Sequence, residues 1–299
     1  MSMSFQIVQL TDSNNNSILK IANDTTEAAI YLNLGASLQK LKLRGELLID
    51  DMSPLTYTQT FASSILFPFA SRVKDGKYTF KGTEYQLEKN NVEEGNAIHG
   101  FVHDKTFNVV RQNLSKNSAS VVLEYKEERL TKGFPFTYKI QLKYVLTNES
   151  LDLHVTILNT STESFPFTLG WHPYFLSSDL NNSFLKFDSN KCVVFDDRMI
   201  TSDTVEIKNE RIFELKNKEL EDCFFLNSNK VVFITPRFKL QMQSSEENDF
   251  LQIYTPPKEN TIAIEPTTGI SDSFNNKIGL RTLKPKEEHQ ILWQLNIEQ

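Results

Sequence analysis

Two side chains in the sequence combine an acid–base group with an apolar setting. His172 lies in the aromatic stretch 165–175, and an imidazole can donate or accept a proton near neutral pH. Glu265 ends the apolar run 262–264, and the proline after it favours an extended backbone. A carboxylate there is either a surface residue or a desolvated base with a raised pKa. Together the two favour proton transfer without a covalent intermediate.

Three further side chains are candidates for binding a polar ligand. Arg72 follows the mostly apolar stretch 65–71, so its guanidinium must find acceptors there or reach water at a sheet edge. His99 precedes a glycine, which would let the backbone approach a ligand closely, although a structural histidine fits the same pattern. Asp222 lies in the charged run 219–222 and is the weakest candidate, because such runs are usually solvated.

Motifs for other kinds of site are missing from the sequence. It contains no dinucleotide-binding or phosphate-binding glycine loop, no nucleophile elbow and no zinc-protease motif. His99 and His103 have the spacing of a helical metal pair, but Gly100 between them and the strand-rich surroundings disfavour a helix. We therefore expect neither a metal nor a cofactor.

Composition and charge exclude several classes of partner. The 299 residues include 32 Lys+Arg and 38 Asp+Glu, which gives a net charge of −6, and no long basic block offers a footprint for nucleic acid. No apolar run is long enough to span a membrane, and the N-terminus does not resemble a secretory signal. Cys192 and Cys223 lack a CxxC spacing, so we expect two free thiols in a cytoplasmic protein.

The elements that must position these residues are mainly strands. Apolar residues alternate with polar ones over 138–146 and 151–157, around the polar loop 147–150, which predicts an antiparallel hairpin with one wet face. The last segment, 289–297, alternates in the same way and should end the chain inside a sheet.

Turns and helices are fewer. The Asp-Gly pair at 75–76 is a strong hairpin signal, and 81–83 reads as another turn. Only 52–66 and 211–220 could hold a helical turn or two. Because no linker divides the chain, we expect one all-β domain over 1–299, a large antiparallel sandwich of stacked sheets with few short helices.

Five short motifs, in order along the chain, resemble those of the aldose 1-epimerase (mutarotase) family. The resemblance extends from about residue 32 to the C-terminus and implies the galactose mutarotase-like supersandwich fold. The motifs are Pro68-Phe69-Ala70-Ser71-Arg72, Gly76-Lys77-Tyr78 with Gly82, Ile98-His99-Gly100, Gly170-Trp171-His172-Pro173-Tyr174-Phe175 and Ile264-Glu265-Pro266.

The resemblance also implies roles for the candidate residues. Glu265 would be the general base that removes the proton of the anomeric hydroxyl, and His172 the general acid that protonates the ring oxygen. His99 and Arg72 would hold the ring oxygen region or ring hydroxyls, and Asp222 would bind other hydroxyls. The sugar ring would open, rotate about C1–C2 and close on its other face.

The sequence departs from the family pattern at three places. Ser71 stands where many members have Asn, 101–104 lacks the glycine-rich continuation of galactose mutarotases, and Thr267 replaces Gln or Met. These departures leave the preferred sugar open and tilt toward the branch that includes glucose-6-phosphate 1-epimerase-like proteins.

Four functions are therefore compared. We expect a cofactor-independent hexose 1-epimerase. Arg72, Lys74 and Lys77 could instead hold the phosphate of a hexose 6-phosphate, unless the lysines are simply solvated. A non-catalytic carbohydrate-binding module is the third, but it would not need both His172 and Glu265. A glycosidase needs a second well-placed carboxylate and is disfavoured.

Overall fold

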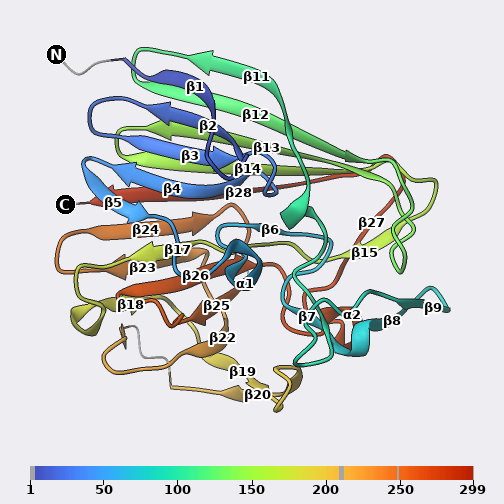
Figure 1. Ribbon diagram of the computed structural model, residues 1–299. Helices are drawn as coiled ribbons and strands as arrows, with labels where there is room; N and C mark the ends of the chain where they lie inside the picture. The colour runs from blue at the N-terminus through green and yellow to red at the C-terminus, as the bar shows by residue number, and fades with distance from the viewer. Residues whose placement is uncertain (1–3, 209–211, 248, 299) are drawn as a thin grey trace.

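The computed structural model describes residues 4–208, 212–247 and 249–298 (Figure 1). Within these residues the chain forms three large antiparallel sheets and three two-stranded ones. The largest has nine strands. In sheet order they are β11 (Asn108–Leu114), β12 (Ser118–Glu127), β13 (Tyr138–Thr147), β14 (Ser150–Asn159), β28 (Glu288–Glu298), β24 (Lys239–Ser244), β23 (Lys230–Ile234), β18 (Phe184–Lys186) and β21 (Phe213–Glu214).

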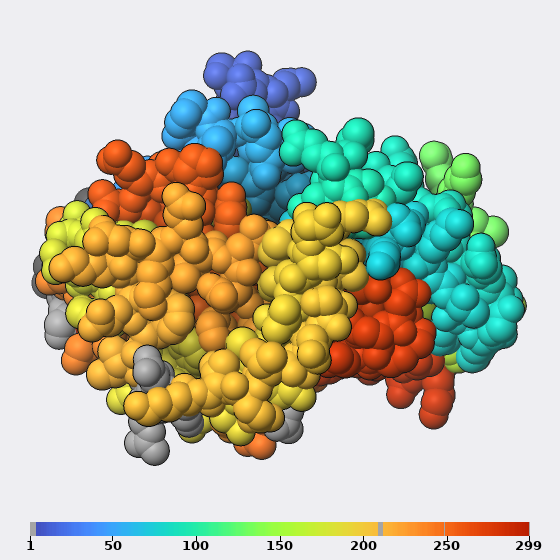
Figure 2. Space-filling model, turned by 90° about the horizontal axis from the view of Figure 1, so that it is seen from below, coloured from blue at the N-terminus to red at the C-terminus, as the bar shows by residue number. Residues whose placement is uncertain are grey.

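A second sheet, of eight strands, lies in the lower half of Figure 1. Seen from below (Figure 2), its yellow segment, which contains β19 and β20, lies between the orange strands and the red and cyan segments. The strands are, in sheet order, β20 (Thr201–Glu206), β19 (Lys191–Phe195), β22 (Glu221–Phe225), β25 (Phe250–Tyr254), β26 (Thr261–Thr267), β16 (Gly170–Trp171) and β6 (Ile65–Leu66), with β17 (Tyr174–Leu176) also paired to β26.

The other strands form the third large sheet and three two-stranded pairs. The N-terminal sheet is a five-stranded meander of β1 (Gln6–Thr11), β2 (Ser17–Ala22), β3 (Glu27–Tyr31), β4 (Ser37–Leu43) and β5 (Glu46–Ile49). Three pairs complete the strands: β7 (Arg72–Val73) with β10 (Ala97–Ile98), β8 (Lys77–Phe80) with β9 (Thr83–Gln86), and β15 (Phe165–Phe167) with β27 (Arg281–Leu283). The α-helices are α1 (Tyr57–Thr60) and α2 (Ser273–Asn276), and the 3-10 segments are η1 (Lys74–Gly76), η2 (Val102–Asp104) and η3 (Leu180–Asn182).

The alternating sequence patterns become strands with one buried face, as predicted. In β13 and β14 the apolar residues of one parity are fully buried, and Leu142 lies opposite Val155 in the register. The polar residues of the other parity face outward. The C-terminal strand β28 pairs with β14 on one side and β24 on the other, so the chain ends inside the nine-stranded sheet.

One contiguous core joins the three large sheets. Its buried side chains come from β2–β5, from the nine-stranded sheet and from the eight-stranded sheet. Trp171 of β16 stacks on Trp293 of β28 with ring centroids 6.2 Å apart, and both side chains are fully buried. The expectation of a large antiparallel β-sandwich is confirmed.

The hairpin expected at 75–76 is wrong, whereas the turn at 81–83 joins β8 to β9 as expected. The strand before the Asp-Gly pair, β7, pairs with β10, and β8 pairs with β9. Gly76 instead lies against the end of β9, where its carbonyl accepts a hydrogen bond from the Leu87 amide (2.7 Å). A tertiary contact therefore overrides the local turn signal.

Of the two segments expected to hold a helical turn, one contains a helix and the other does not. Helix α1 lies inside 52–66, as predicted. Residue 211 lies outside the described residues, and 212–220 contains β21 rather than a helix, because Phe213 packs against Phe187 and Phe224. Helix α2 was not predicted. Among the described helices, none has the length and hydropathy needed to span a membrane.

Candidate active site

A cleft of about 590 Å³ opens beside the eight-stranded sheet. Strands β22, β25 and β26 form its floor, and side chains of α1, of the loop 90–94 and of the segment 269–271 line its sides. Arg72, His99, His172 and Glu265 all line this cleft. The structure therefore brings together four of the five side chains that the sequence singled out, from positions up to 193 residues apart (265 − 72).

The central feature of the cleft is the contact between His172 and Glu265. The Nε2 atom of His172 lies 3.4 Å from Oε1 of Glu265, and the two residues are only 5% and 3% exposed. Both backbones are held by the sheet: the His172 amide donates to the Ser64 carbonyl (3.0 Å), and the Ile264 amide donates to that of Pro173 (3.2 Å). The imidazole and the carboxylate consequently face each other in a fixed geometry.

Burial sets the protonation of this pair. It raises the pKa of Glu265 well above its ordinary value, although nearby Arg72 acts in the opposite direction. It lowers the pKa of His172 to about 4. Both shifts disfavour the charged form of each side chain, so burial favours a pair with no net charge that shares one exchangeable proton.

His99 lies next to this pair. Its ring meets that of His172 edge-on, with centroids 5.1 Å apart. Burial, followed by the charges of His172 and Arg72, lowers the pKa of His99 well below its usual value. Neither His99 nor His172 has a partner for its buried Nδ1 atom among the described residues, so both rings retain an unused polar atom.

The glycine after His99 has a different role from the one expected. A Cβ atom on Gly100 would lie 2.1 Å from the Phe67 carbonyl oxygen, and both His99 and Gly100 have positive φ. The close approach that glycine permits is therefore to the chain itself rather than to a ligand. It turns the backbone after β10 so that the imidazole reaches the cleft.

Arg72 is the only cation of the four, and two carboxylates that the sequence did not reveal hold it. Its Nε and Nη2 donate to Glu94 at 2.5 and 2.7 Å, and Nη2 also donates to Glu221 at 3.3 Å. The side chain is 12% exposed, so these acceptors satisfy a largely buried charge. Glu94 lies in a polar turn without any motif, which is why sequence reasoning missed it.

The expectation for Asp222 is not met, because the structure does not place its side chain in the cleft. Strand β22 directs Glu221 and Cys223 into the cleft, so Asp222 and Phe224 face the opposite side, where Phe224 packs on Phe187. Burial there raises the pKa of Asp222. Neighbouring residues of a strand face opposite sides, so the carboxylate that lines the cleft belongs to the adjacent residue, Glu221.

The sequence analysis also considered His99 and His103 as a metal pair and Cys192 and Cys223 as thiols. The ring of Phe61 lies between His99 and His103, with centroid distances of 5.0 and 4.9 Å, so the two imidazoles do not converge. Over the described residues, no group of three or more His, Cys, Asp or Glu side chains is arranged to hold a metal ion. Cys192 and Cys223 are both free thiols.

Comparisons with known proteins identify the fold and the family. A curated relative, the uncharacterized protein YihR of Escherichia coli K12, is 20% identical over 279 residues, which cover 89% of each chain. The structure of a galactose mutarotase-like protein from Clostridium acetobutylicum superposes with a TM-score of 0.88 at 20% identity, over 99% of both chains.

The galactose 1-epimerase of Lactobacillus acidophilus NCFM has a TM-score of 0.80 at 19% identity, again over 99% of both chains. These likenesses show that the fold is galactose mutarotase-like. The family model described as aldose 1-epimerase matches residues 17–295. With nearly the whole sequence matched, the chain belongs to the aldose 1-epimerase family.

Proposed function

We propose that this protein is a cofactor-independent 1-epimerase that interconverts the α and β anomers of a free hexose. The observation that carries the proposal is the buried contact of 3.4 Å between His172 and Glu265 at the cleft. Opening a pyranose ring requires one proton to leave the anomeric hydroxyl and another to reach the ring oxygen. An acid and a base fixed on one side of the cleft can perform both transfers.

In the proposed reaction the pair enters the first step as an ion pair, after its shared proton has passed from Glu265 to His172 across their 3.4 Å contact. Glu265 takes the anomeric proton while His172 protonates the ring oxygen, which leaves a neutral acid, a neutral imidazole and an open-chain aldehyde. After rotation about C1–C2, the reverse transfers close the ring on its other face. The pair has no net charge before and after each transfer, which suits a site in which burial penalises charge.

The other residues of the cleft would hold the sugar. The imidazole of His99 and the guanidinium of Arg72 line the cleft and are suited to the ring oxygen and hydroxyls, and the carboxylate of Glu221 can accept from a hydroxyl. Ser71 and Thr267, two of the departures from the family pattern, also line the cleft. We propose that they influence which hexose is preferred.

The charges of the cleft support a neutral sugar over a hexose 6-phosphate. Three glutamates besides Glu265 line it beside the single guanidinium of Arg72, and neither Lys74 nor Lys77 does. These glutamates are Glu93, Glu94 and Glu221. Because carboxylates already neutralise Arg72, a phosphate placed there would meet like charges.

The two free cysteines further support a reducing, cytoplasmic location.

Polarimetry tests the proposal directly. Freshly dissolved α-glucose and α-galactose should reach anomeric equilibrium faster with the protein than in buffer, and kcat/KM for the preferred free hexose should exceed that for glucose 6-phosphate by at least about tenfold. A tenfold preference for the phosphate that weakens with added salt would favour the 6-phosphate enzyme instead. Sugar binding without any rate increase would indicate a binding module.

A further inference from the structure

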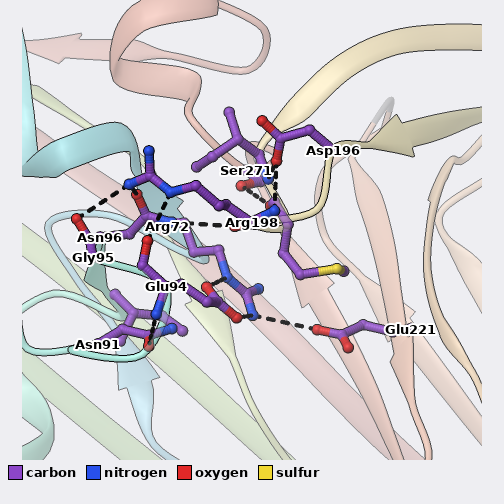
Figure 3. A network of polar contacts seen from close by, with 12 residues as sticks. Arg72, Asn91, Glu94, Gly95, Asn96, Asp196, Arg198, Glu221 and Ser271 are labelled. Atoms are coloured by element: carbon purple, nitrogen blue, oxygen red, sulfur yellow. Dashed lines mark hydrogen bonds and ion pairs between the residues drawn. The ribbon is translucent and has the colours of Figure 1, made fainter.

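Arg198 lies in the loop between β19 and β20 and does not line the cleft, yet it holds the segment that carries Glu94 (Figure 3). Its Nε donates to the Glu94 carbonyl at 2.7 Å, and its Nη2 donates to the Asn96 side chain at 2.8 Å and to the Gly95 carbonyl at 3.3 Å. Nη2 also contacts Asp75 at 2.8 Å. One guanidinium therefore binds three consecutive residues of a cleft loop.

Within this loop the hydrogen bonds centre on Asn91, whose amide donates to the Asn96 carbonyl at 3.1 Å and whose side-chain oxygen accepts from the Glu94 amide at 3.3 Å. The amides of Gly95 and Asn96 both donate to the Asn91 carbonyl, at 2.9 and 3.1 Å. Val92, beside it, is 83% exposed, so no apolar packing anchors the tip. The carboxylate of Glu94 nevertheless makes two hydrogen bonds to Arg72, so any movement of the loop would move the cation in the cleft.

The backbone around Arg198 is held by three further hydrogen bonds. Its amide donates to the Asp196 carboxylate at 2.9 Å, and its carbonyl accepts from the Asn96 side chain at 3.1 Å. The next residue, Met199, accepts at its carbonyl from the Ser271 hydroxyl at 2.7 Å. The anchor for the guanidinium is therefore the segment after β26, which also lines the cleft.

The contacts close into a ring. The amide of Asp272, next to Ser271, donates to the Arg72 carbonyl at 2.7 Å. Arg72, Glu94, Arg198 and this segment thus fix one another, with Arg198 as the link between the β19–β20 loop and the loop of Glu94. An arginine suits this place because its planar fork of donors can serve several separate acceptors, whereas a lysine acts as a point charge.

We propose that Arg198 is a positioning residue for sugar binding: it fixes the loop so that Glu94 presents Arg72 to the substrate. The inference rests on the proposed function, in which Arg72 contacts the sugar. Because Arg198 touches neither His172 nor Glu265, its loss should weaken binding and leave proton transfer nearly unchanged.

The kinetic test compares Arg198→Ala and Arg198→Lys with Arg237→Ala. Arg237 is an exposed arginine that pairs only with Glu46 in the described structure, so its variant controls for loss of a surface arginine. We expect KM to rise about tenfold in both Arg198 variants, with kcat within about twofold of wild type. The lysine variant should not restore KM, since it cannot serve the same acceptors.

A double-mutant cycle asks whether Arg198 acts through Glu94. In a Glu94→Gln background, Arg198→Ala should raise KM by less than about twofold further, because the residue it positions is already impaired. Two independent tenfold effects that multiply would contradict the proposal. So would a fall in kcat as large as the fall in kcat/KM.

Hydrogen exchange supplies a readout that needs no sugar. In Arg198→Ala the amides of Gly95 and Asn96 should exchange at least about tenfold faster, whereas those of β13 and β14 should stay unchanged. If the wild-type protein epimerises no sugar but exchange responds in this way, the proposed function fails while the loop-holding role stands. If exchange and KM both match wild type, or exchange rises throughout the molecule, the positioning role is wrong.

Discussion

At the scale of single residues, the cleft depends on two groups whose charged forms are disfavoured by burial. Glu265 and His172 both lose solvation, which raises the pKa of the carboxyl and lowers that of the imidazole. The sequence identified both residues, because each interrupts an apolar run with a group that can transfer protons. It could not establish their separation, which depends on how β16, β17 and β26 pair.

The pH dependence of activity should report this pair. A second proton on the pair leaves an acid without a base, so kcat/KM should fall as the pH drops through about 4, the lowered pKa of His172. At high pH, loss of the remaining proton leaves a base without an acid. A pH–rate profile on the free hexose measures this, and an acid limb near the ordinary histidine pKa would contradict it.

Removing the carboxyl should stabilise the fold while it impairs function. The folded-state pKa of Glu265 is raised, so the unfolded chain releases this proton first and stability is lost as the pH rises above about 4.5. Glu265→Gln removes that loss. Its Tm should exceed that of wild type by an amount that grows from pH 5 to pH 8 in thermal unfolding. A difference that shrinks over this range would show that Glu265 is ionised in the folded protein.

At the scale of elements, the alternation of β22 decides which acidic residue reaches the cleft. Glu221 contacts Arg72, and Asp222 points to the other face. We therefore expect Glu221→Gln to raise KM for the hexose about five- to tenfold, whereas Asp222→Asn should leave KM within about twofold. Steady-state polarimetry on the two neighbouring variants decides the matter, and the reverse order would restore the assignment made from the sequence.

The same scale shows what could be predicted from the sequence. Period-two patterns located β13, β14 and β28, because a strand with one buried face has apolar residues at every second position. The Asp-Gly pair at 75–76 misled, because β7 finds its partner in β10 rather than across the turn. No sequence motif marks Glu94 or Arg198, because their structural role depends on contacts between loops that lie 104 residues apart (198 − 94).

At the scale of the whole molecule, the core couples the sheets. The protein has only two tryptophans, and each reports on one sheet: Trp171 on the eight-stranded sheet and Trp293 on the nine-stranded one. We propose that the chain unfolds as one unit. The single-tryptophan variants Trp171→Phe and Trp293→Phe should each show one urea transition, and in each it should coincide with far-UV circular dichroism.

Truncating Trp293 tests how much this packing between the sheets contributes to the free energy of unfolding. Trp293→Ala should lower the free energy of unfolding by about 3–5 kcal/mol, because the cavity would lie where the two sheets meet. Separate transitions for fluorescence and circular dichroism, or a loss below about 1 kcal/mol, would contradict a shared core.

The central claim is that Glu265 is the base that opens the sugar ring. The most direct measurement is kcat for mutarotation of the preferred free hexose at saturating concentration, for wild type and Glu265→Gln, with folding of the variant verified by circular dichroism. The amide keeps the size of the side chain but cannot accept the proton, so kcat should fall by at least about 100-fold. A folded Glu265→Gln variant with kcat within about threefold of wild type would contradict the account.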